Sequence, residues 1–463
     1  MKKKMEQFKK LTRSIFSLIL LLCQTAIFAH TWIHDYNSAI VLPFVHKGNL
    51  LFYAIFFLIL LFFSTSLDGL RFGTYRPGNL ITGQILALLG ALFVSYMQIV
   101  LLAAGFLSPV PLIFTFIQQS LFTILYTFGA TFLFLKLFKS KTVLLIYDTY
   151  SPETFIEKLK LRKDIFTLKK IVNLTDGMDG LPELIAETDS VIIYDVHAEK
   201  RNKILKMCFE SNTRAYTTSK VSDILIRGAE SLHMFDTPLL LCRNIGLTFW
   251  ERFVKRFFDI LISALMLIVF SPLLLLCAIA IKIYDGGPVF FRQARGTIGG
   301  KIFYIHKFRS MIVNAEQDGA PKPCENYDPR ITPVGKILRA TRLDELPQLI
   351  DILFGNMSLV GPRPERIEHI KQYTEEIPEF SYRLKVKGGL TGYAQLYGKY
   401  NTTPYDKLQL DLMYIQNYSL LLDIRLLMMT VKIMFMKEST EGFSKEKSKK
   451  INEKSLLQNE NKE

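Results

Sequence analysis

Residues 339–364 read RATRLDELPQLIDILFGNMSLVGPRP, and the rest of the chain is best understood around this stretch. Two adjacent carboxylates, Asp344 and Glu345, precede an apolar run with helical spacing that ends at Gly355. The positive end of a helix favours carboxylates in its first turn. We therefore expect at least one of the two to stay ionised near neutral pH.

Basic and turn-forming residues flank the two carboxylates. Arg339 precedes them, and Gly361-Pro362-Arg363-Pro364 forms a stiff loop that can hold one guanidinium in a fixed place. An ionised carboxylate, a metal-capable neighbour and fixed arginines together suit phosphoryl transfer. The simpler alternative is that Thr341 and Asp344 form a capping box. On these residues alone, the capping box is the favoured interpretation.

The apolar residues of the 463-residue chain are concentrated in a few long runs. Four runs before residue 138 predict transmembrane helices. They lie near residues 15–28, 50–63, 80–106 and 111–137. The basic residues favour one side of this region, so the positive-inside rule places the N-terminus and everything after Lys139 in the cytoplasm. We therefore expect a multi-pass protein of the cytoplasmic (inner) membrane.

The formal net charge of +15 narrows the choice of partners. No zinc finger or aromatic ribonucleoprotein motif accompanies this charge, so we do not expect nucleic acid as a partner. Anionic lipid and phosphate-bearing substrates explain the basic excess with fewer assumptions. The five cysteines lie far apart and form no CxxC pair, which predicts reduced thiols.

Between residues 141 and 247 the pattern changes to short β-branched runs that alternate with polar helical segments. These runs predict the buried parallel strands of a small Rossmann-like sheet. The predicted strands are Val143–Tyr147, Ile171–Leu174, Val191–Asp195 and Pro238–Cys242. The first strand leads into Asp-Thr-Tyr-Ser-Pro and not into a GxGxxG loop, so we expect no bound dinucleotide and a structural or regulatory role.

A further apolar stretch, residues 257–283, is broken in its middle by Ser271-Pro272. It is long enough to span the bilayer, and a fifth spanning helix would carry the carboxylates to the outer face. The alternative is a re-entrant hairpin that bends at Pro272 and returns to the side from which it entered. Lys255 and Arg256 precede the segment as basic residues at the membrane surface. Together with the basic residues that follow it, Arg292, Arg295, Lys301 and Lys307, they favour keeping both ends in the cytoplasm, as in the hairpin. Sequence physics alone leaves the two topologies evenly balanced.

Several motifs occur in a fixed order between about residues 249 and 437. They are KRFFD (255–259), SP (271–272), KFRSM (307–311), DPRIT (328–332), LDELPQ (343–348), GPRP (361–364) and LTG (390–392). In this order they resemble the bacterial sugar transferase family, the polyprenyl-phosphate glycosyl-1-phosphate transferases. The N-terminal half resembles the large form of that family. One departure is Gly388-Gly389, where Pro-Gly usually precedes the last motif.

The resemblance implies that a UDP-sugar gives its sugar-1-phosphate to undecaprenyl phosphate and releases UMP. Asp344 stands at the position of the family's nucleophile, which forms a covalent phosphosugar intermediate. The resemblance also implies Mg²⁺, with Glu345 and Asp344 as its expected ligands. Because both phosphates lie at the cytoplasmic face, it favours the hairpin for residues 257–283. The product would start a capsule, exopolysaccharide or O-antigen-type glycan.

Four basic residues are candidate phosphate ligands. Arg339 and Arg363 can pair bidentately with phosphate oxygens as charge shifts. Arg309 and Lys307 are weaker candidates, for which contact with the membrane surface is an equally good interpretation. Further along, residues 405–437 contain two apolar-faced helices, which could be core helices or could lie on the leaflet, and the leaflet is the favoured interpretation. The charged tail, residues 438–463, is expected to be disordered.

The expected architecture is a mixed membrane protein with four parts. They are four transmembrane helices (1–140), a degenerate Rossmann-like α/β domain (141–247), a mainly helical monotopic catalytic domain with a re-entrant membrane helix (248–437), and the tail. One rival is a membrane nucleotide-sugar dehydratase, which the missing glycine loop disfavours. Another is a catalytically silent scaffold, which the intact Asp344-Glu345 pair disfavours. A homodimer and downstream glycosyltransferases stay open as partners.

Overall fold

The computed structural model describes residues 2–242, 246–313, 315, 328–398 and 402–435. The chain divides into two compact units, Met1–Thr218 and Ser219–Glu463. The tail expected to be disordered, residues 438–463, lies outside the described residues.

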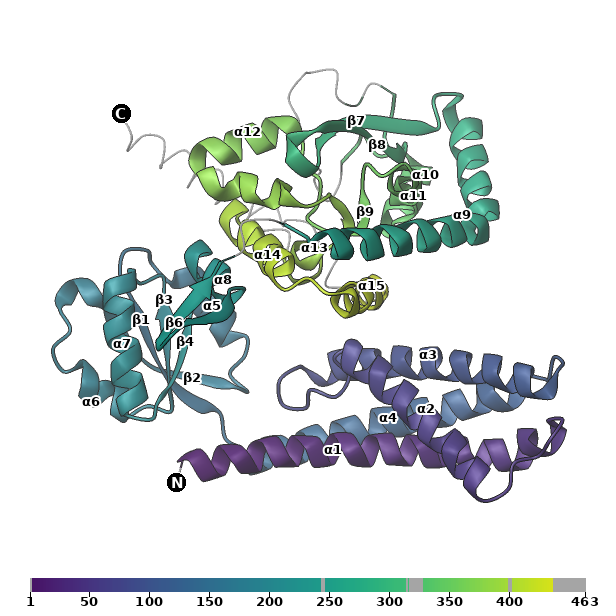
Figure 1. Ribbon diagram of the computed structural model, residues 1–463, viewed down its shortest axis with the longest axis horizontal. Helices are drawn as coiled ribbons and strands as arrows, with labels where there is room; N and C mark the ends of the chain where they lie inside the picture. Colours follow the sequence, from purple (N-terminus) through teal and green to yellow (C-terminus); the bar gives the residue numbers. More distant parts are fainter. Residues whose placement is uncertain (1, 243–245, 314, 316–327, 399–401, 436–463) are drawn as a thin grey trace. The chain divides into compact units, whose positions relative to one another are not determined.

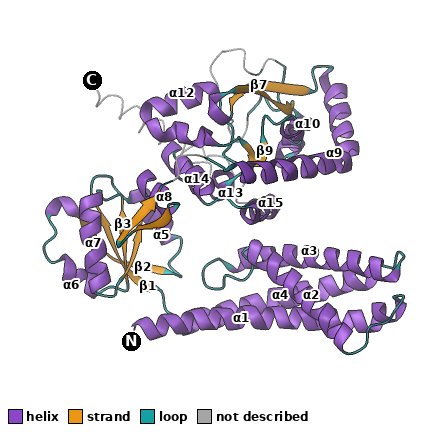
Figure 2. Cartoon of the chain, viewed as in Figure 1, coloured by secondary structure: helices purple, strands orange, loops and turns teal. Residues whose placement is uncertain are grey.

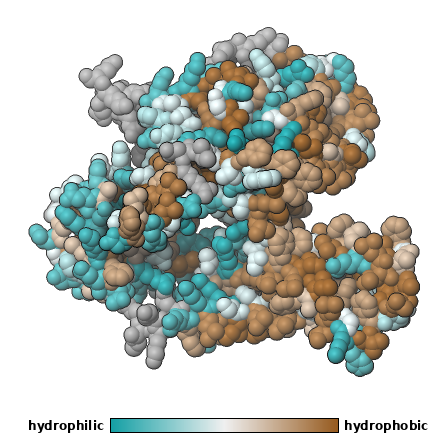
Figure 3. Space-filling model, in the orientation of Figure 1, coloured by the Kyte–Doolittle hydropathy of each residue, from teal (hydrophilic) through white to brown (hydrophobic). Residues whose placement is uncertain are grey.

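Long apolar helices occupy the N-terminal region where the apolar runs predicted them. They are α1 (Lys2–Thr31), α2 (Lys47–Ser66), α3 (Pro77–Ala103) and α4 (Val110–Leu137). They lie alongside one another (Figure 1), and each contains a segment long and apolar enough to cross a membrane. Apolar side chains predominate on the face of these helices that Figure 3 shows. Some of the polar groups between them are paired, as in the hydrogen bond from Gln24 to Thr123 at 2.9 Å.

A parallel four-stranded sheet follows, in the order β2-β1-β3-β4. Its strands are β1 (Lys141–Tyr147), β2 (Phe166–Asn173), β3 (Ser190–Tyr194) and β4 (Arg214–Thr217). The helices α5 (Glu153–Lys160), α6 (Leu181–Ala186) and α7 (Ala198–Glu210) connect them. Val143 through Ile146 are fully buried, because helices cover both faces of a parallel sheet. Three of the predicted strands are thus confirmed.

The fourth predicted strand, Pro238–Cys242, is not part of this sheet. The segment β6 (Thr237–Leu241) pairs antiparallel with β5 (Glu230–Met234) in a separate two-stranded hairpin. All residues of both strands are exposed, and the hairpin belongs to the C-terminal unit. The true fourth strand, β4, is short and polar, so it carried no apolar run that could mark it.

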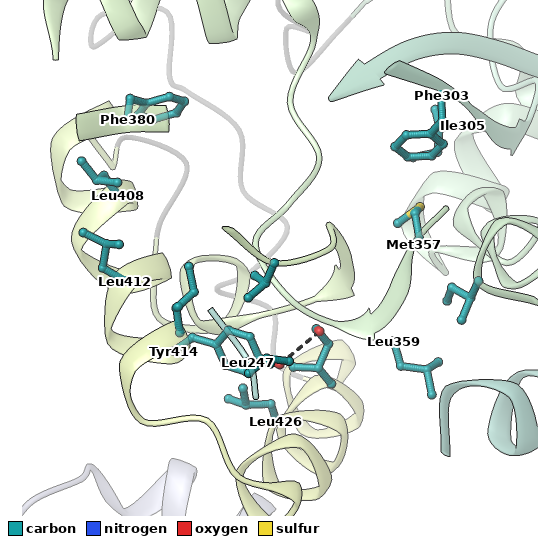
Figure 4. Close-up of a cluster of buried hydrophobic side chains, with 14 of the residues drawn as sticks. Leu247, Phe303, Ile305, Met357, Leu359, Phe380, Leu408, Leu412, Tyr414 and Leu426 are labelled. Carbon is teal, nitrogen blue, oxygen red and sulfur yellow. Dashed lines mark hydrogen bonds between the residues drawn. The ribbon is translucent and has the colours of Figure 1, made fainter. Parts of the chain in front are cut away.

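The C-terminal unit is built around a hydrophobic core to which both helices and strands contribute (Figure 4). Its strands are β7 (Phe290–Gly296), β8 (Ile302–Phe308), β9 (Ser358–Val360) and β10 (Gly389–Thr391). Its longer helices are α8 (Val221–Arg227), α9 (Phe249–Asp285), α10 (Pro333–Ala340), α11 (Gln348–Leu353), α12 (Ile367–Glu376), α14 (Pro404–Gln416) and α15 (Leu420–Met434). β7 and β8 form an antiparallel hairpin, whereas β9 and β10 pair in parallel.

The expectation that α14 and α15 lie on the leaflet with their apolar faces is wrong. Leu408 and Leu412 of α14 and Leu426 of α15 are at most 1% exposed and belong to the core (Figure 4). A helix with apolar residues along one face can bury that face in protein or in lipid, and the periodicity is the same in both cases.

Helix α9 is drawn as two arms that meet at a sharp bend (Figure 1), and its one internal proline is Pro272. On the N-terminal side of Pro272, Ile262 and Met266 pack against the main core. On the C-terminal side, Cys277 and Ile281 form a cluster with residues of β8 and α10. Both arms therefore attach to the same folded unit.

The basic residues that precede the apolar part of α9 do not lie at a membrane surface as predicted. Lys255 is 7% exposed, and its Nζ donates to Asp423 at 2.5 Å. Arg256 donates to the carbonyls of Ile352 and Leu353, the last residues of α11. Both cations thus fasten α9 to its own domain, because a buried lysine needs a paired carboxylate and a helix C-terminus attracts cations.

Candidate active site

The two carboxylates are displayed on a tight turn between two helices. Residues Leu343–Glu345 form a 3₁₀ turn after α10, and α11 begins only at Gln348. Arg342 opens this turn with φ of 57°, a left-handed conformation that non-glycine residues adopt rarely and at a cost of roughly 1–2 kcal/mol. The sequence had suggested that Asp344 and Glu345 lie in the first turn of α11. In the structure they precede that helix.

The capping-box interpretation of Thr341 is wrong. Its hydroxyl donates backwards to the carbonyls of Ile337 at 2.8 Å and Leu338 at 3.2 Å, so it belongs to the end of α10. A capping box would need the Thr341 N–H to donate to the Asp344 carboxylate, but this N–H donates to the Ile337 carbonyl at 3.0 Å. The simplest structural explanation for Asp344 is thereby removed.

Glu345 is bound by two cations. Its Oε1 accepts from Lys307 Nζ at 2.8 Å and from Arg363 Nη2 at 2.9 Å. Burial by itself would raise the pKa of Glu345, but Arg363 and Lys307 outweigh it and hold the pKa far below the usual range. The two cations thus favour the ionised form of Glu345.

The cations come from separate elements and depend on Glu345. Lys307 lies on β8, and burial lowers its pKa while Glu345 acts in the opposite direction. Arg363 lies in the loop after β9, where the charge of Glu345 raises its pKa. The fold thus brings together three residues that the sequence placed in three different motifs.

Asp344 has the opposite surroundings. Burial first, and then the charge of Glu345, raise the pKa of its carboxyl, while Lys307, Arg339 and Arg363 oppose the rise. Within the described ranges, no residue donates a hydrogen bond to Asp344 or forms an ion pair with it. Its half-buried carboxylate is thus free to react, and Arg339 acts on it through its charge.

Arg309 is engaged elsewhere. Its Nη1 donates to Asp285 at 2.8 Å, its Nη2 pairs with the other oxygen of the same carboxylate, and its Nε donates to the carbonyl of Pro288 at 2.8 Å. The side chain is only 7% exposed. These contacts fasten the end of α9 to β8, and they leave Arg309 no free face for a phosphate. Its role as a phosphate ligand stays a prediction that its contacts do not favour.

Sequence reasoning missed a buried ionic cluster behind the Arg363 loop. It contains Glu365, Arg383, Lys407 and Asp411. Glu365 follows the GPRP motif directly, so a carboxylate continuing that motif was a usable signal. Arg383 and Asp411 offered no local pattern, because their partners lie far away in sequence.

Sequence reasoning also missed His306, which directly precedes Lys307 in the chain. Its ring Nδ1 lies 2.7 Å from an oxygen of the fully buried Asp351, whose other oxygen accepts from the His306 backbone N–H at 2.8 Å. This pair joins β8 to α11, as Lys307 and Glu345 join β8 to the turn before it. The two contacts together fix the turn on the strand.

The carboxylates have a donor set that suits a magnesium ion brought by a phosphate substrate. Among the residues that the structure describes, no group of three or more His, Cys, Asp or Glu side chains could hold a metal. Asp344 and Glu345 thus offer two carboxylates at most. Mg²⁺ commonly binds through one or two carboxylates and takes its other ligands from substrate phosphates and water.

The C-terminal part of the chain is similar to known proteins. The model of the family described as bacterial sugar transferase matches residues 250–437. A Klebsiella pneumoniae protein named UDP-glucose:undecaprenyl-phosphate glucose-1-phosphate transferase is 43% identical over 211 residues, which are 44% of this chain and 43% of that protein. An Aeromonas hydrophila protein named UDP-N-acetylgalactosamine-undecaprenyl-phosphate N-acetylgalactosaminephosphotransferase is 36% identical over 54% of this chain and 60% of its own length.

These matches span only about half of each relative's length. A shorter relative, an uncharacterised sugar transferase of Bacillus subtilis, is 36% identical over 188 residues. The match takes in 41% of this chain and 90% of that protein. The similarity therefore covers almost the whole length of this shorter relative.

Proposed function

The chain belongs to the bacterial sugar transferase family, and on that premise we propose that it transfers a sugar-1-phosphate from a UDP-sugar to undecaprenyl phosphate. The names of the Klebsiella and Aeromonas relatives support this reaction class. The observation that carries the proposal is the unpaired Asp344 beside a Glu345 that two cations hold. Because the relatives' names contain different sugars, the proposal does not extend to the identity of the sugar.

The reaction proceeds in two displacements. An oxygen of Asp344 attacks the phosphorus that carries the sugar, the bond from that phosphorus to the UMP oxygen breaks, and UMP leaves. The phosphate oxygen of undecaprenyl phosphate then attacks the same phosphorus. The bond to Asp344 breaks, so the carboxylate is regenerated and the lipid carries a diphosphate-linked sugar. Such a product would be the first intermediate of a capsule, exopolysaccharide or O-antigen-type glycan.

The surrounding charges suit this chemistry. Arg363 and Lys307 meet on one oxygen of Glu345, which places two cations next to the residue that follows the nucleophile. Arg339 adds a third positive charge that acts on Asp344. Cations in fixed positions stabilise the charge that develops on transferring phosphoryl oxygens. A magnesium ion, when bound by Asp344 and Glu345, would neutralise phosphate charge in addition.

Undecaprenyl phosphate carries its phosphate at a membrane surface, where the soluble UDP-sugar has to meet it, and α9 suits that location. The helix is apolar enough to enter a bilayer, yet both of its arms attach to the unit that carries Asp344. Exposed apolar residues such as Leu265, Ile268 and Leu276 lie on both sides of Pro272. A re-entrant helix meets these conditions, since a straight helix of 37 residues would separate its ends by roughly 55 Å. The basic side of α1–α4 supports a cytoplasmic location for the site.

The test is a burst experiment on the full chain in membranes or detergent. With UDP-sugar alone, the wild type should release UMP up to about one per active site, because the first displacement needs no lipid. Asp344→Asn keeps the shape of the side chain and should abolish the burst, with turnover reduced by roughly 10³-fold or more. If UMP appears only after undecaprenyl phosphate is added, the transfer is direct and Asp344 is not the nucleophile. If no UDP-sugar yields UMP in either condition, the proposed function is wrong.

A further inference from the structure

The loop that carries Arg363 is held by its backbone as well as by its side chain. Pro362 and Pro364 have no N–H and so cannot donate backbone hydrogen bonds. The carbonyls of the loop accept hydrogen bonds from side chains of other elements. The carbonyl of Pro364 accepts from Arg295 at 3.1 Å. The carbonyl of Arg363 itself accepts from Nη2 of Arg383 at 2.8 Å. The buried guanidinium of Arg383 thus donates to the backbone of Arg363, whose own guanidinium donates to Glu345.

Arg383 is one of the most deeply buried charges of the C-terminal unit. Its side chain is 2% exposed, and that of its partner Asp411 is 1% exposed. Nε and Nη2 of Arg383 lie 3.0 Å and 2.7 Å from the same oxygen of Asp411. Glu365 lies 3.7 Å from Nη1 and also pairs with Lys407 at 3.0 Å. Two positive and two negative side chains therefore form a balanced cluster.

Stability alone gives little reason for such a cluster. A buried ion pair is often no more stabilising than apolar side chains of the same volume, because both charges lose their hydration. An apolar side chain at position 383 would lack one thing, namely a donor for the carbonyl of Arg363. That hydrogen bond is the only contact of the Arg383–Asp411 pair, among the described residues, that reaches the backbone of the active-site loop.

We propose that Arg383, oriented by Asp411, is a positioning residue for Arg363 in the sugar-phosphate transfer, an inference that rests on the proposed function. Asp411 fixes one edge of the Arg383 guanidinium, Arg383 fixes the Arg363 carbonyl, and the Arg363 side chain then reaches Glu345 at 2.9 Å. Arg383 touches no substrate in this scheme. It sets where the active-site cation stands when charge develops on the phosphate.

The key variant removes both charges of the pair at once. Arg383→Met with Asp411→Asn preserves side-chain volume and leaves Glu365 and Lys407 paired with each other. A displaced catalytic group can cost roughly 10²-fold in rate. We expect kcat to fall by about that factor, while the KM for the UDP-sugar changes less than about twofold, because Arg363 acts most strongly on the transition state.

A matched control exists in the same unit. Lys255 and Asp423 form another buried ion pair, which joins α9 to α15. In Lys255→Met with Asp423→Asn, the Tyr414 hydroxyl keeps the Val360 carbonyl as a partner at 3.2 Å. We expect this variant to retain kcat within about threefold. A loss equal to that of the Arg383 variant would show that any buried pair has the same effect, and would overturn the positioning role.

A double-mutant cycle with Arg363→Lys tests whether the two arginines act as one unit. If Arg383 acts through Arg363, the combined variant should lose little more activity than the worse of its two components. Losses that multiply would mean that Arg383 acts independently, and the proposal would fail. Arg383→Lys keeps the charge and its partner and should lose less than Arg383→Met, so it serves as the test if the paired variant does not fold.

Hydrogen exchange supplies a readout that needs no substrate. In the full chain, the peptide covering residues 358–366 should exchange faster in the Arg383→Met/Asp411→Asn variant, with α9 and α10 unchanged. Unchanged exchange of this peptide would overturn the proposal even in an active enzyme. If the wild type transfers no sugar phosphate, the proposed function is wrong. Faster exchange in the variant would still show that Arg383 is coupled to the loop.

Discussion

Asp344 and Glu345 are neighbours in the chain and meet opposite surroundings. Two cations bind the carboxylate of Glu345 and lower its pKa, whereas burial and the charge of Glu345 raise the pKa of Asp344. Environments that push two titrating groups apart commonly assign them separate roles. Here the ionised Glu345 orders the cations, and Asp344 keeps an oxygen without a partner among the described residues.

The raised pKa of Asp344 should appear in the pH dependence of the reaction. Only the ionised carboxylate attacks, so kcat/KM should fall as the pH drops through that pKa, at a higher pH than an ordinary aspartate gives. Arg339 opposes the rise, so Arg339→Met should raise the pKa further and move the acid limb to higher pH. Lys336→Met, an exposed change on the same helix, is the control. An acid limb that stays in place or moves down contradicts this assignment.

Lys307 gives a prediction on the alkaline side. Burial lowers its pKa, and Glu345 counteracts that effect. In Glu345→Gln this support is lost, the pKa of Lys307 falls further, and the side chain becomes neutral as the pH rises. The variant should therefore lose rate on the alkaline side at a lower pH than the wild type does. Glu345→Asp keeps the charge and should lose less. A Glu345→Gln profile parallel to that of the wild type would contradict the coupling.

At the scale of single elements, α9 is the decisive case. If it is re-entrant, the exposed residues Arg252 and Arg292 on its two flanks lie on one side of the membrane. In a chain whose five native cysteines are replaced by serine or alanine, single cysteines at these positions should both resist an impermeant thiol reagent in intact cells. Cysteine at Lys139 should also resist it, and cysteine at Lys47 should react. Labelling of Arg292→Cys but not Arg252→Cys would establish a spanning helix.

Elements that are uniformly apolar could be predicted from the sequence, and elements whose partners are distant could not. The helices α1–α4 and α9 and the strands β1 and β3 follow from long apolar runs. The run at Pro238–Cys242 misled, because nothing in it shows that the strand is exposed. The site was predictable in its carboxylates and in Arg363, which lie in compact motifs. Lys255 was misassigned because its partner, Asp423, follows 168 residues later.

At the scale of the whole molecule, the boundary between the two units predicts where the smallest active fragment begins. Every group of the proposed site lies in the unit that begins at Ser219. Helix α8 belongs to this unit, and its Val221 and Ile224 are part of the main core. A fragment that starts at Ser219 should therefore keep transfer activity in detergent.

A shorter fragment that starts at Leu247 should be unstable. It lacks both core residues of α8, and the loss of each buried aliphatic side chain costs roughly 2 kcal/mol or more. Thermal unfolding of the two fragments, followed by assay of UMP release, distinguishes them. Equal stability of both fragments would show that α8 is dispensable. Inactivity of a stable Ser219 fragment would show that the N-terminal unit takes part in the chemistry.

The pairing of Lys255 with Asp423 also bears on how the protein is made. At ribosomal rates of about 5–20 residues per second, the 168 residues between them take roughly ten to thirty seconds to synthesise. Throughout that interval Lys255 has no carboxylate partner and acts as a free cation at the start of an apolar segment. A free cation beside an apolar segment favours keeping that end on the side of synthesis. Folding then buries Lys255 against Asp423, so a charge that is exposed during synthesis is no longer exposed in the folded protein.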